Sequence, residues 1–401
     1  MTIFAVLLLL PGTILALFGA YQIGLLLLSL VYNFLHRRDV LITTPPDKRF
    51  VVIVPAHNEE LLIGRTVDTI LGSNYPRELL HLVVVADNCN DATANIVRAH
   101  GGTCFERHDL ERRGKPYALD WTIRKLDLNA YDGLIIIDAD TEIHPEFLAR
   151  MDAYLKRGHQ AMQGYFGVQN PDQNWLTRLA LLPGTLKFKL HFPGKELVGL
   201  SCPLAGNGMC FDIGLIKKYG WHAFSITENW EYWVLLTLDG VRVASAPEAI
   251  IYSQVAKSLK SGETQRMRWM RGRIGTLLSY GGRLLRRGLL DFDARKIDAV
   301  LELAKPSHAM YLAWSMLYLA GTAALWFWGG TAYWQFVLAV AIVASQLAFL
   351  ILGFAIDRPP WRTWVALLMV PWYVAWKLVV SLRGLLGLRD RTWVRTKRNN
   401  S

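Results

Sequence analysis

The sequence "LIIIDADTEI" runs from Leu134 to Ile143, and it decides the class of fold. Its apolar run ends abruptly in Asp138-Ala139-Asp140. Short, nearly continuous apolar runs of this kind are typical of parallel strands buried on both faces of a sheet. Two similar Val-rich runs precede it, "FVVIVPA" at 50–56 and "HLVVVAD" at 81–87.

Helical patterns alternate with these apolar runs. They lie near residues 59–72, 91–100 and 116–127. Strands that alternate with helices predict a doubly wound α/β sheet, which we place over residues 45–256. In such sheets, ligands bind beyond the carboxyl ends of the strands.

Each predicted strand is followed by polar, acid-bearing residues. Asn and Asp are ordinary turn and helix-cap residues, and we interpret Asp91 in that way. Three such strand ends at one edge of a sheet nevertheless indicate a binding site. The three segments are Pro55-Ala56-His57-Asn58-Glu59, Asp87-Asn88-Cys89-Asn90-Asp91 and Asp138-Ala139-Asp140.

The two carboxylates of Asp138 and Asp140 predict a metal site. Alternation along a strand would point both to the same side. Carboxylate oxygens suit Mg²⁺ or Mn²⁺, and such an ion would offset charge on a diphosphate leaving group. The other Asp-x-Asp, Asp291-Phe292-Asp293, follows a basic segment and no strand, so we expect a helix cap or a solvated turn there.

Two stretches without Asp, Glu, Lys or Arg predict membrane helices, because a bilayer core needs about 20 apolar residues per helix. Residues 1–36 form the first, an N-terminal transmembrane anchor. Its charges follow the run, as His36-Arg37-Arg38, and it is longer than the apolar part of a signal peptide, so we expect it to be retained. Residues 306–356 hold two transmembrane helices that turn at Gly329-Gly330-Thr331.

The segment 357–401 leaves two alternatives open. Residues 363–376 are uncharged but short for a span, and Pro371 interrupts them. We therefore favour an interfacial or re-entrant helix over a fourth transmembrane helix, followed by a basic cytoplasmic tail.

Basic residues dominate the chain, which carries a net charge of +11 over 401 residues. They gather beside apolar segments, which suits membrane lipids with anionic head groups better than nucleic acid. By the positive-inside rule, we expect residues 45–256 to lie in the cytoplasm, at the cytoplasmic (inner) membrane. The four cysteines are scattered without a Cys-x-x-Cys, which argues against a zinc site.

Five motifs in order resemble the membrane-embedded family 2 glycosyltransferases, the group that includes cellulose, chitin and hyaluronan synthases. The resemblance implies a GT-A fold, with inverting transfer from a nucleotide-diphosphate sugar to form a β linkage. We favour a UDP-sugar as the donor. The motifs are Pro55-Ala56-His57-Asn58-Glu59, Asp87, Asp138-Ala139-Asp140, Thr227-Glu228-Asn229 and Gln265-Arg266-Met267-Arg268-Trp269.

The resemblance also implies roles for single residues. By this resemblance, Asp140 would bind the metal and Asp138 would lie near the diphosphate. Gly206-Asn207-Gly208, together with Trp269, would line the path of the acceptor. Nucleotide-sugar binding falls to Pro55, Ala56, Asn58, Glu59, Asp87, Lys115, Asp138, Gln265, Arg268 and Trp269.

The Gln265-x-x-Arg268-Trp269 segment has a physical interpretation of its own. On a helix these three side chains share one face, where Arg268 can neutralise a diphosphate and Trp269 can stack on a sugar. Nine Lys or Arg residues in 257–287 also indicate a helix at the membrane surface. We expect both, and assign 257–305 to amphipathic interface helices.

Position 229 departs from the family pattern, in which Asp is the general base. An amide cannot accept a proton at neutral pH. Glu228 is the replacement that we favour, Glu231 is a second candidate, and a protein without a base, in which Asn229 only binds the acceptor hydroxyl, is a third reading.

The predicted function is transfer of a sugar to a membrane-associated lipid or glycan acceptor. Three or four membrane helices are few for a closed polymer channel, which favours single transfer over a processive exopolysaccharide synthase, although an oligomer or an export partner could supply a channel. A non-catalytic nucleotide-sugar or glycan-binding subunit of an export complex is the remaining alternative, favoured only by Asn229.

Overall fold

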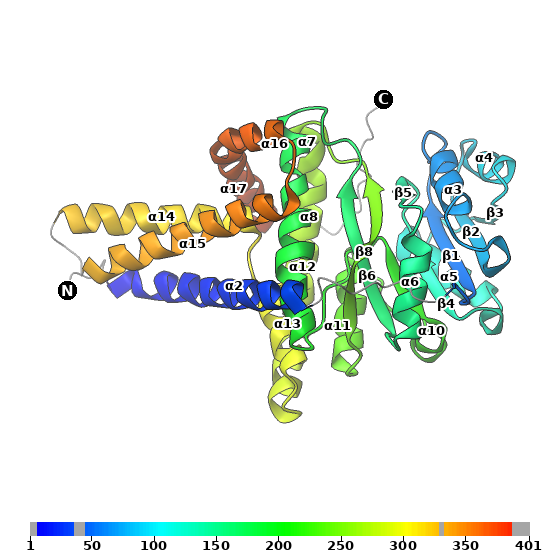
Figure 1. The fold of residues 1–401 in the computed structure, drawn as a ribbon, viewed down its shortest axis with the longest axis horizontal. Coiled ribbons are helices and arrows are strands. Elements are labelled where there is room, and N and C mark those ends of the chain that lie inside the picture. Colours follow the sequence, from blue (N-terminus) through cyan, green and yellow to red (C-terminus); the bar gives the residue numbers. More distant parts are fainter. Residues whose placement is uncertain (1–5, 36–44, 329–332, 387–401) are drawn as a thin grey trace.

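The computed structural model describes residues 6–35, 45–328 and 333–386. Its centre is a sheet of eight strands in the order β3-β2-β1-β4-β7-β6-β8-β5 (Figure 1). The strands are β1 Phe50–Ala56, β2 Leu80–Asp87, β3 Thr103–Arg107, β4 Gly133–Ile136, β5 Thr141–Ile143, β6 Ala161–Val168, β7 Met209–Asp212 and β8 Val243–Ser253.

The first half of the sheet is parallel, as the apolar runs predict. Strand β1 pairs with β2 and β4, and β2 pairs with β3, all in parallel. Their carboxyl ends therefore meet at one edge. The predicted third strand was too long, because β4 ends at Ile136 and the residues up to Asp140 leave the sheet.

The second half of the sheet is mixed, which the sequence did not indicate. Strand β7 is antiparallel to both β4 and β6, and β5 is antiparallel to β8. Strands β6 and β8 are parallel, with an irregularity between Gly164 and Tyr165. Strands β5 and β7 are short, and the strands of this half pair with partners that lie far away in the sequence.

Helices cover both faces of the sheet. Side chains of α3 and α6 share one core with β1, and side chains of α5, α10 and α11 share a second core on the other face. The bounds are α3 Ile63–Leu71, α4 Thr93–Ala99, α5 Lys115–Lys125, α6 Phe147–Lys156, α10 Ile213–Tyr219 and α11 Glu228–Leu238, with short 3₁₀ segments at Arg77–Leu79 and Leu128–Ala130.

A layer of helices separates the sheet from the apolar helices. In Figure 1, α8, α12 and α13 run across the ends of α2, α14 and α15. The layer consists of α7 Trp175–Leu179, α8 Leu181–Thr185, the π-helical segment η3 Leu186–His191, α9 Phe192–Leu197, α12 Leu259–Leu290 and α13 Ala294–Ala304. The part from α7 to α9 was not anticipated from the sequence.

Four described helices are long and apolar enough to cross a membrane. They are Leu9–Leu35, His308–Phe327, Tyr333–Ile356 and Trp361–Gly384. In full, these elements are α2 Leu9–Leu35, α14 His308–Phe327, α15 Tyr333–Asp357, α16 Trp361–Ala366, the 3₁₀ turn Leu367–Met369 and α17 Val370–Leu386.

The last of these helices differs from the others in direction. Helices α2, α14 and α15 run alongside one another, whereas α17 runs steeply across them in this view (Figure 1). The choice between an interfacial helix and a fourth span stays a prediction. His36-Arg37-Arg38, the turn Gly329-Gly330-Thr331 and the tail beyond residue 386 lie outside the described residues.

Small residues let α2 approach α14 closely. A Cβ at Gly12 would overlap the Tyr318 ring, and one at Gly19 would meet the Tyr311 hydroxyl. Tyr311 in turn donates a hydrogen bond to the carbonyl of Leu15 at 2.7 Å. Close packing and this hydrogen bond therefore hold the two helices together.

Candidate active site

The Lys115 ammonium group lies where three distant segments meet. Lys115 is the first residue of α5, directly after Gly114, whose φ of 107° a residue with a side chain would rarely adopt. Its Nζ donates to Asp138 Oδ1 at 2.5 Å and to the Gly206 carbonyl, and lies 3.7 Å from Glu228 Oε1. Two carboxylates, from after β4 and the start of α11, and one backbone carbonyl, from before β7, thus surround one cation.

This convergence shifts the proton affinity of two groups. Burial acts to lower the pKa of Lys115, but the carboxylates of Asp138 and Glu228 outweigh it, and the pKa is raised. Burial raises the pKa of Glu228, and Lys115 and Arg268 offset that rise only in part. A carboxylate with a raised pKa is a better proton acceptor than an exposed one.

Asp138 and Asp140 lie on a turn, so strand alternation does not set their directions. The Asp138 carbonyl accepts from the Thr141 N–H at 3.2 Å, and the Asp138 N–H donates to Asn207 Oδ1 at 3.0 Å. Asp138 is 38% exposed and therefore accessible to a ligand. Within the described ranges, no three His, Cys, Asp or Glu side chains lie together as a set of metal ligands. A metal ion at this turn would therefore take at most these two carboxylates from the protein.

Asn207 acts as a clamp beneath that turn. Its side chain is buried, and its amide donates to Thr141 Oγ1 at 2.7 Å and to Ser253 Oγ at 3.3 Å. The flanking glycines, Gly206 and Gly208, have φ values of 91° and 65°. The loop places the Gly206 carbonyl on Lys115, whereas the Asn207 amide is fully used inside the protein.

The carboxylate of Asp87, at the end of β2, is paired with an arginine that sequence analysis missed. Arg107, the last residue of β3, donates to Asp87 Oδ1 at 2.5 Å, and both side chains are buried. Asp87 Oδ2 accepts from the Gly114 N–H at 3.3 Å. Asp87 therefore anchors the segment that presents Lys115. The sequence gives no signal for this pair, because β3 was not predicted and the pairing depends on β3 lying beside β2.

The loop after β1 lies against the loop after β2. Pro55 and Ala56 end β1, and Asn58, with a φ of 56°, accepts from the Asn90 N–H through Oδ1 at 2.9 Å. The Glu59 N–H donates to Thr93 Oγ1 at 2.8 Å. The predicted nucleotide-binding residues at these two strand ends thus form one connected edge.

The start of α11 separates the three candidates for a proton acceptor. Glu228 faces Lys115, whereas the Asn229 amide donates to the Leu204 carbonyl at 2.6 Å. Glu231 accepts from the Ser225 N–H and from the Tyr280 hydroxyl, each at 2.8 Å. Asn229 and Glu231 therefore hold the local structure.

Helix α12 reaches this region near Arg268 and Gly272. Arg268 acts electrostatically on Glu228, and one turn further along, Gly272 packs so closely on Thr227 that a Cβ would overlap it. Trp269 is 52% exposed. Gln265, Arg268, Trp269 and Gly272 follow helical spacing, so they lie on one side of α12, and Gly272 on that side packs on the start of α11.

The opposite face of α12 is covered by α17. The Arg266 guanidinium lies 5.1 Å from the Trp376 ring centre, and Arg271 donates to the Gly384 carbonyl at 3.2 Å. A Cβ on Gly384 would overlap the Met270 side chain. One helix is therefore shared by the candidate site and the apolar C-terminal region.

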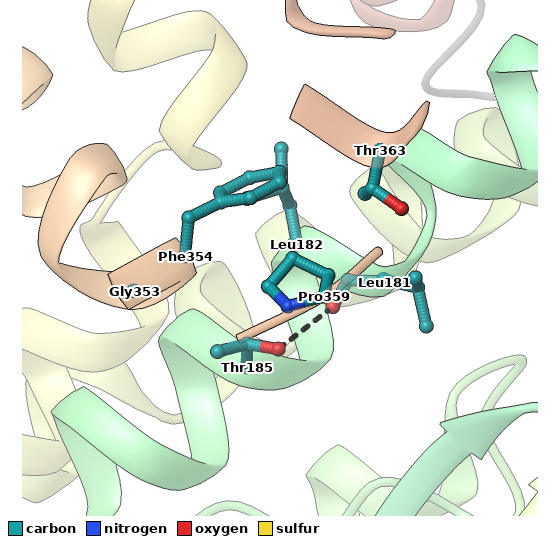
Figure 2. A pocket seen from close by; sticks show the side chains of 7 residues that line it. All are labelled: Leu181, Leu182, Thr185, Gly353, Phe354, Pro359 and Thr363. Carbon is teal, nitrogen blue, oxygen red and sulfur yellow. Dashed lines mark hydrogen bonds between the residues drawn. The ribbon is translucent and has the colours of Figure 1, made fainter. Parts of the chain in front are cut away.

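A small pocket among the apolar helices contains none of the site residues. Figure 2 shows it between α8, the end of α15 and α16, with largely apolar walls. The Thr185 hydroxyl in its wall donates to the Leu181 carbonyl at 3.3 Å. Its lining is Leu181, Leu182, Thr185, Gly353, Phe354, Pro359 and Thr363.

Comparisons with known proteins agree with this geometry. The model of the family described as glycosyltransferase like family 2 matches residues 45–272. The probable glycosyltransferase YdaM of Bacillus subtilis is 27% identical over 262 residues, which are 60% of either chain. Glucomannan 4-beta-mannosyltransferase 7 of Arabidopsis thaliana is 23% identical over 59% of this chain and 44% of its own. The chain thus spans about half the length of the curated relatives it matches.

One solved structure matches nearly the whole chain. It is the mannosyltransferase PcManGT from Pyrobaculum calidifontis, in complex with GDP-Man and Mn²⁺. The match covers 94% of this chain and 99% of that one, with a TM-score of 0.51 and 19% identity. It shows a shared fold that includes the helices outside the sheet domain.

Proposed function

Because this chain belongs to glycosyltransferase family 2, we propose that it transfers a sugar from a nucleotide-diphosphate sugar to a membrane-associated lipid or glycan acceptor. The donor that we favour is a UDP-sugar, and the product is a β linkage formed with inversion. The observation that carries the proposal is the convergence of Asp138, Gly206 and Glu228 on Lys115 at the carboxyl edge of the sheet.

The donor would lie along this edge. Its nucleoside would contact the connected loops at Ala56–Glu59 and Asp87, which Arg107 holds in place. Its diphosphate would lie between Lys115 and Arg268, two cations from opposite sides of the site. Helices α5 and α11 also begin at this edge of the sheet, and the N-terminus of a helix favours negative charge.

A divalent cation, Mg²⁺ or Mn²⁺, fits the donor set. Asp138 and Asp140 offer hard oxygen ligands, and the remaining positions would be filled by diphosphate oxygens and water, as is usual for these ions. When bound, the ion would neutralise charge on the leaving diphosphate. Three carboxylates and a diphosphate exceed the charge that Lys115 and Arg268 can balance, which also favours a metal.

Glu228 is the residue that we propose as general base. It would accept the proton of the acceptor hydroxyl as the sugar carbon is attacked, and burial raises its pKa. Glu231 is engaged by Ser225 and Tyr280, which argues against it. The bond from Asn229 to Leu204 gives the amide a structural reason to be there, which weakens the case for a non-catalytic subunit.

The acceptor would approach from the side of α12, where Trp269 is exposed. The interfacial helices support a site at the cytoplasmic surface of the inner membrane. Four candidate membrane helices are few for a polymer channel within one chain, so single transfer remains the favoured mode over processive synthesis, and an oligomer or export partner would be required for the latter.

Release of nucleoside diphosphate by the purified chain in lipid tests the proposal. UDP- and GDP-sugars would be screened with Mg²⁺ or Mn²⁺ and membrane extract as acceptor, using wild type, Asp140→Ala, Glu228→Gln and Glu231→Gln. We expect turnover that Asp140→Ala abolishes, that Glu228→Gln lowers about 10²–10⁴-fold without loss of donor binding, and that Glu231→Gln largely keeps. Donor binding by wild type without any release would refute the catalytic assignment.

A further inference from the structure

The two ends of α14 mark the two surfaces of a bilayer. Aromatic side chains gather where α14 ends and α15 begins, and there Trp326, Trp328, Tyr333 and Trp334 are between 48% and 78% exposed. Trp and Tyr are enriched at the head-group level of membranes. Helix α14 has 20 residues and is therefore about 30 Å long, which is the thickness of the hydrocarbon core. Its other end, beside α12 and α13, thus lies at the bilayer surface that faces the sheet (Figure 1).

The last apolar segment, from α16 to α17, lies at this sheet-side surface from its first helix onward. Helix α16 packs on α7, and Ala366 shares an apolar cluster with Leu179. Near the start of α17, the Tyr373 ring lies 5.5 Å from the Arg266 guanidinium of α12. Helix α17 also packs on α14. The first half of the segment therefore stays beside the layer of α7 and α12.

The end of α17 contacts the same part of α12. A Cβ at Gly384 would overlap the Met270 side chain, and the Gly384 carbonyl accepts a hydrogen bond from Arg271 at 3.2 Å. The Arg383 guanidinium lies 3.2 Å from the Glu263 carboxylate. A helix that crossed the bilayer would end about 30 Å from where it entered. Because the start, middle and end of the segment all contact α7 or α12, these contacts fit a segment that lies along the surface.

One face of this segment is apolar and exposed. Its residues follow one another at intervals of three or four, so they form one continuous stripe along the helices. The stripe is Trp361, Val365, Leu368, Trp372, Ala375, Val379 and Leu382. Small residues on the other side of the segment are buried against the protein: Thr363, Ala366, Ser381 and Gly384. The segment therefore packs on the protein with one face and presents an apolar surface with the other.

Charged and aromatic groups lie at both ends of the stripe. Arg362 is exposed, and its guanidinium lies 5.9 Å from the centre of the Trp361 ring. At the other end, the Arg383 side chain is 65% exposed. Such side chains suit the head-group level, where anionic lipids attract cations and Trp rings are enriched. The whole surface thus matches one lipid leaflet, with acyl chains against the stripe and head groups beside its ends.

We propose that α16 and α17 lie in a single leaflet, the one on the side of the sheet, with the stripe docked on lipid acyl chains. The chain then crosses the bilayer three times, through α2, α14 and α15, and continues beyond Leu386 on the side of the sheet. Of the two alternatives that the sequence leaves open for this segment, the contacts favour the interfacial one. This arrangement does not depend on sugar transfer, so it can fail or hold independently of the proposed function.

Chemical labelling of the full chain in sealed vesicles tests the number of crossings. Cysteines would be introduced one at a time after Cys89 and Cys104, which are partly exposed, are changed to serine. In vesicles that hold the chain mostly in one orientation, a membrane-impermeant maleimide should label Ser401→Cys to the same extent as Asn95→Cys of the sheet domain. Trp328→Cys, at the far end of α14, should give the complementary fraction. Labelling of Ser401→Cys to the extent of Trp328→Cys would overturn the proposal, because α17 would then cross the bilayer.

Depth measurements test the contact with lipid. Spin labels would be placed at Leu368→Cys, Ala375→Cys and Leu382→Cys, which are exposed positions where a label displaces no packed side chain. Power saturation with oxygen and a water-soluble nickel complex should give three depths that agree within about 5 Å, all shallower than Leu347→Cys on the exposed side of α15. A crossing helix would instead separate Leu368 from Leu382 by about 20 Å and overturn the proposal. Poor access of oxygen, with broadening between labels on two copies, would assign the stripe to a second chain and overturn the lipid contact.

Discussion

Asn229→Asp tests whether the amide at this position is structural. The substitution introduces the residue that the family pattern leads one to expect as the base, and it changes one donor nitrogen to an oxygen. In the wild type, Asn229 is buried and its amide donates to the Leu204 carbonyl at 2.6 Å. An ionised carboxylate would place two acceptor oxygens against each other there, so we expect the variant to be destabilised without becoming more active.

The magnitude follows from the two ways in which the variant can respond. An unsatisfied buried acceptor costs about 1–3 kcal/mol. Alternatively, the new carboxyl can bind a proton and donate to Leu204. From an unfolded pKa near 3.9, protonation at pH 7 costs at most about 4 kcal/mol, since each unit is worth 1.36 kcal/mol. The free energy of unfolding should therefore fall by about 1–4 kcal/mol at pH 7.

The sign of the pH dependence is also fixed. A carboxyl whose folded pKa lies above its unfolded pKa carries no penalty at low pH, and the penalty grows as pH rises. At pH 5 the upper limit falls to about 1.5 kcal/mol. The thermal midpoint in detergent, measured from pH 5 to pH 8, reports this, at roughly 2–4 °C per kcal/mol for a domain of this size.

Asn95→Asp is a matched control, because Asn95 is exposed on α4. It adds the same charge and should shift the midpoint little at any pH. If Asn229→Asp proved as stable as wild type at pH 7 and gained turnover, the amide would not be structural and Glu228 would not be the base.

Three further predictions concern the surroundings of the site. Gly272→Ala should lower turnover about tenfold or more, because its Cβ would push α12 away from the start of α11. Gly275→Ala is the control: its Cβ would meet open space, so the variant should be neutral or more stable by about 0.5–1 kcal/mol. Steady-state kinetics and thermal melting would measure the two effects. The pH profile of turnover should show an acid limb at the raised pKa of Glu228, with activity falling as pH drops through it; a limb unchanged in Glu228→Gln would contradict the assignment. Arg107→Gln should lower the free energy of unfolding by about 3–5 kcal/mol, because it leaves the Asp87 carboxylate unpaired, and it should raise the KM for the donor. Adding Asp87→Asn should recover part of the lost stability. A double variant less stable than Arg107→Gln would refute the pairing.

The sequence predicted three of the four strands in the parallel half of the sheet, because a strand buried on both faces is an unbroken run of apolar residues. It missed β3, whose residues are mostly exposed or half-buried. The run at 50–56 has the same bounds as β1, and the run at 81–87 covers all of β2 except its first residue, Leu80. It could not predict where β4 stops. The Asp138 N–H is taken by the Asn207 side chain, a contact between residues 69 positions apart.

For the candidate site, the sequence predicted individual helices and motifs, but not the contacts between residues far apart in the chain. The spacing of Gln265, Arg268 and Trp269 predicted a helix, and α12 confirms it. The second Asp-x-Asp was rightly interpreted as a cap, since Asp293 accepts from the Arg295 N–H at the start of α13. The Arg107 pairing could not be predicted, because it depends on two strands lying side by side.

The packing of α17 on α12 has a consequence for the order in which the protein is made. The ribosome completes the sheet domain and α12 well before it reaches Gly384, whose backbone carbonyl accepts a hydrogen bond from Arg271. Until then, the side of α12 that carries Met267 and Met270 has no cover. A chain interrupted before residue 370 would hold every residue assigned to sugar transfer, yet lack the support behind the helix that closes the site. Synthesis of the last apolar helix thus becomes the step that completes the enzyme, and partial products of translation should be inert.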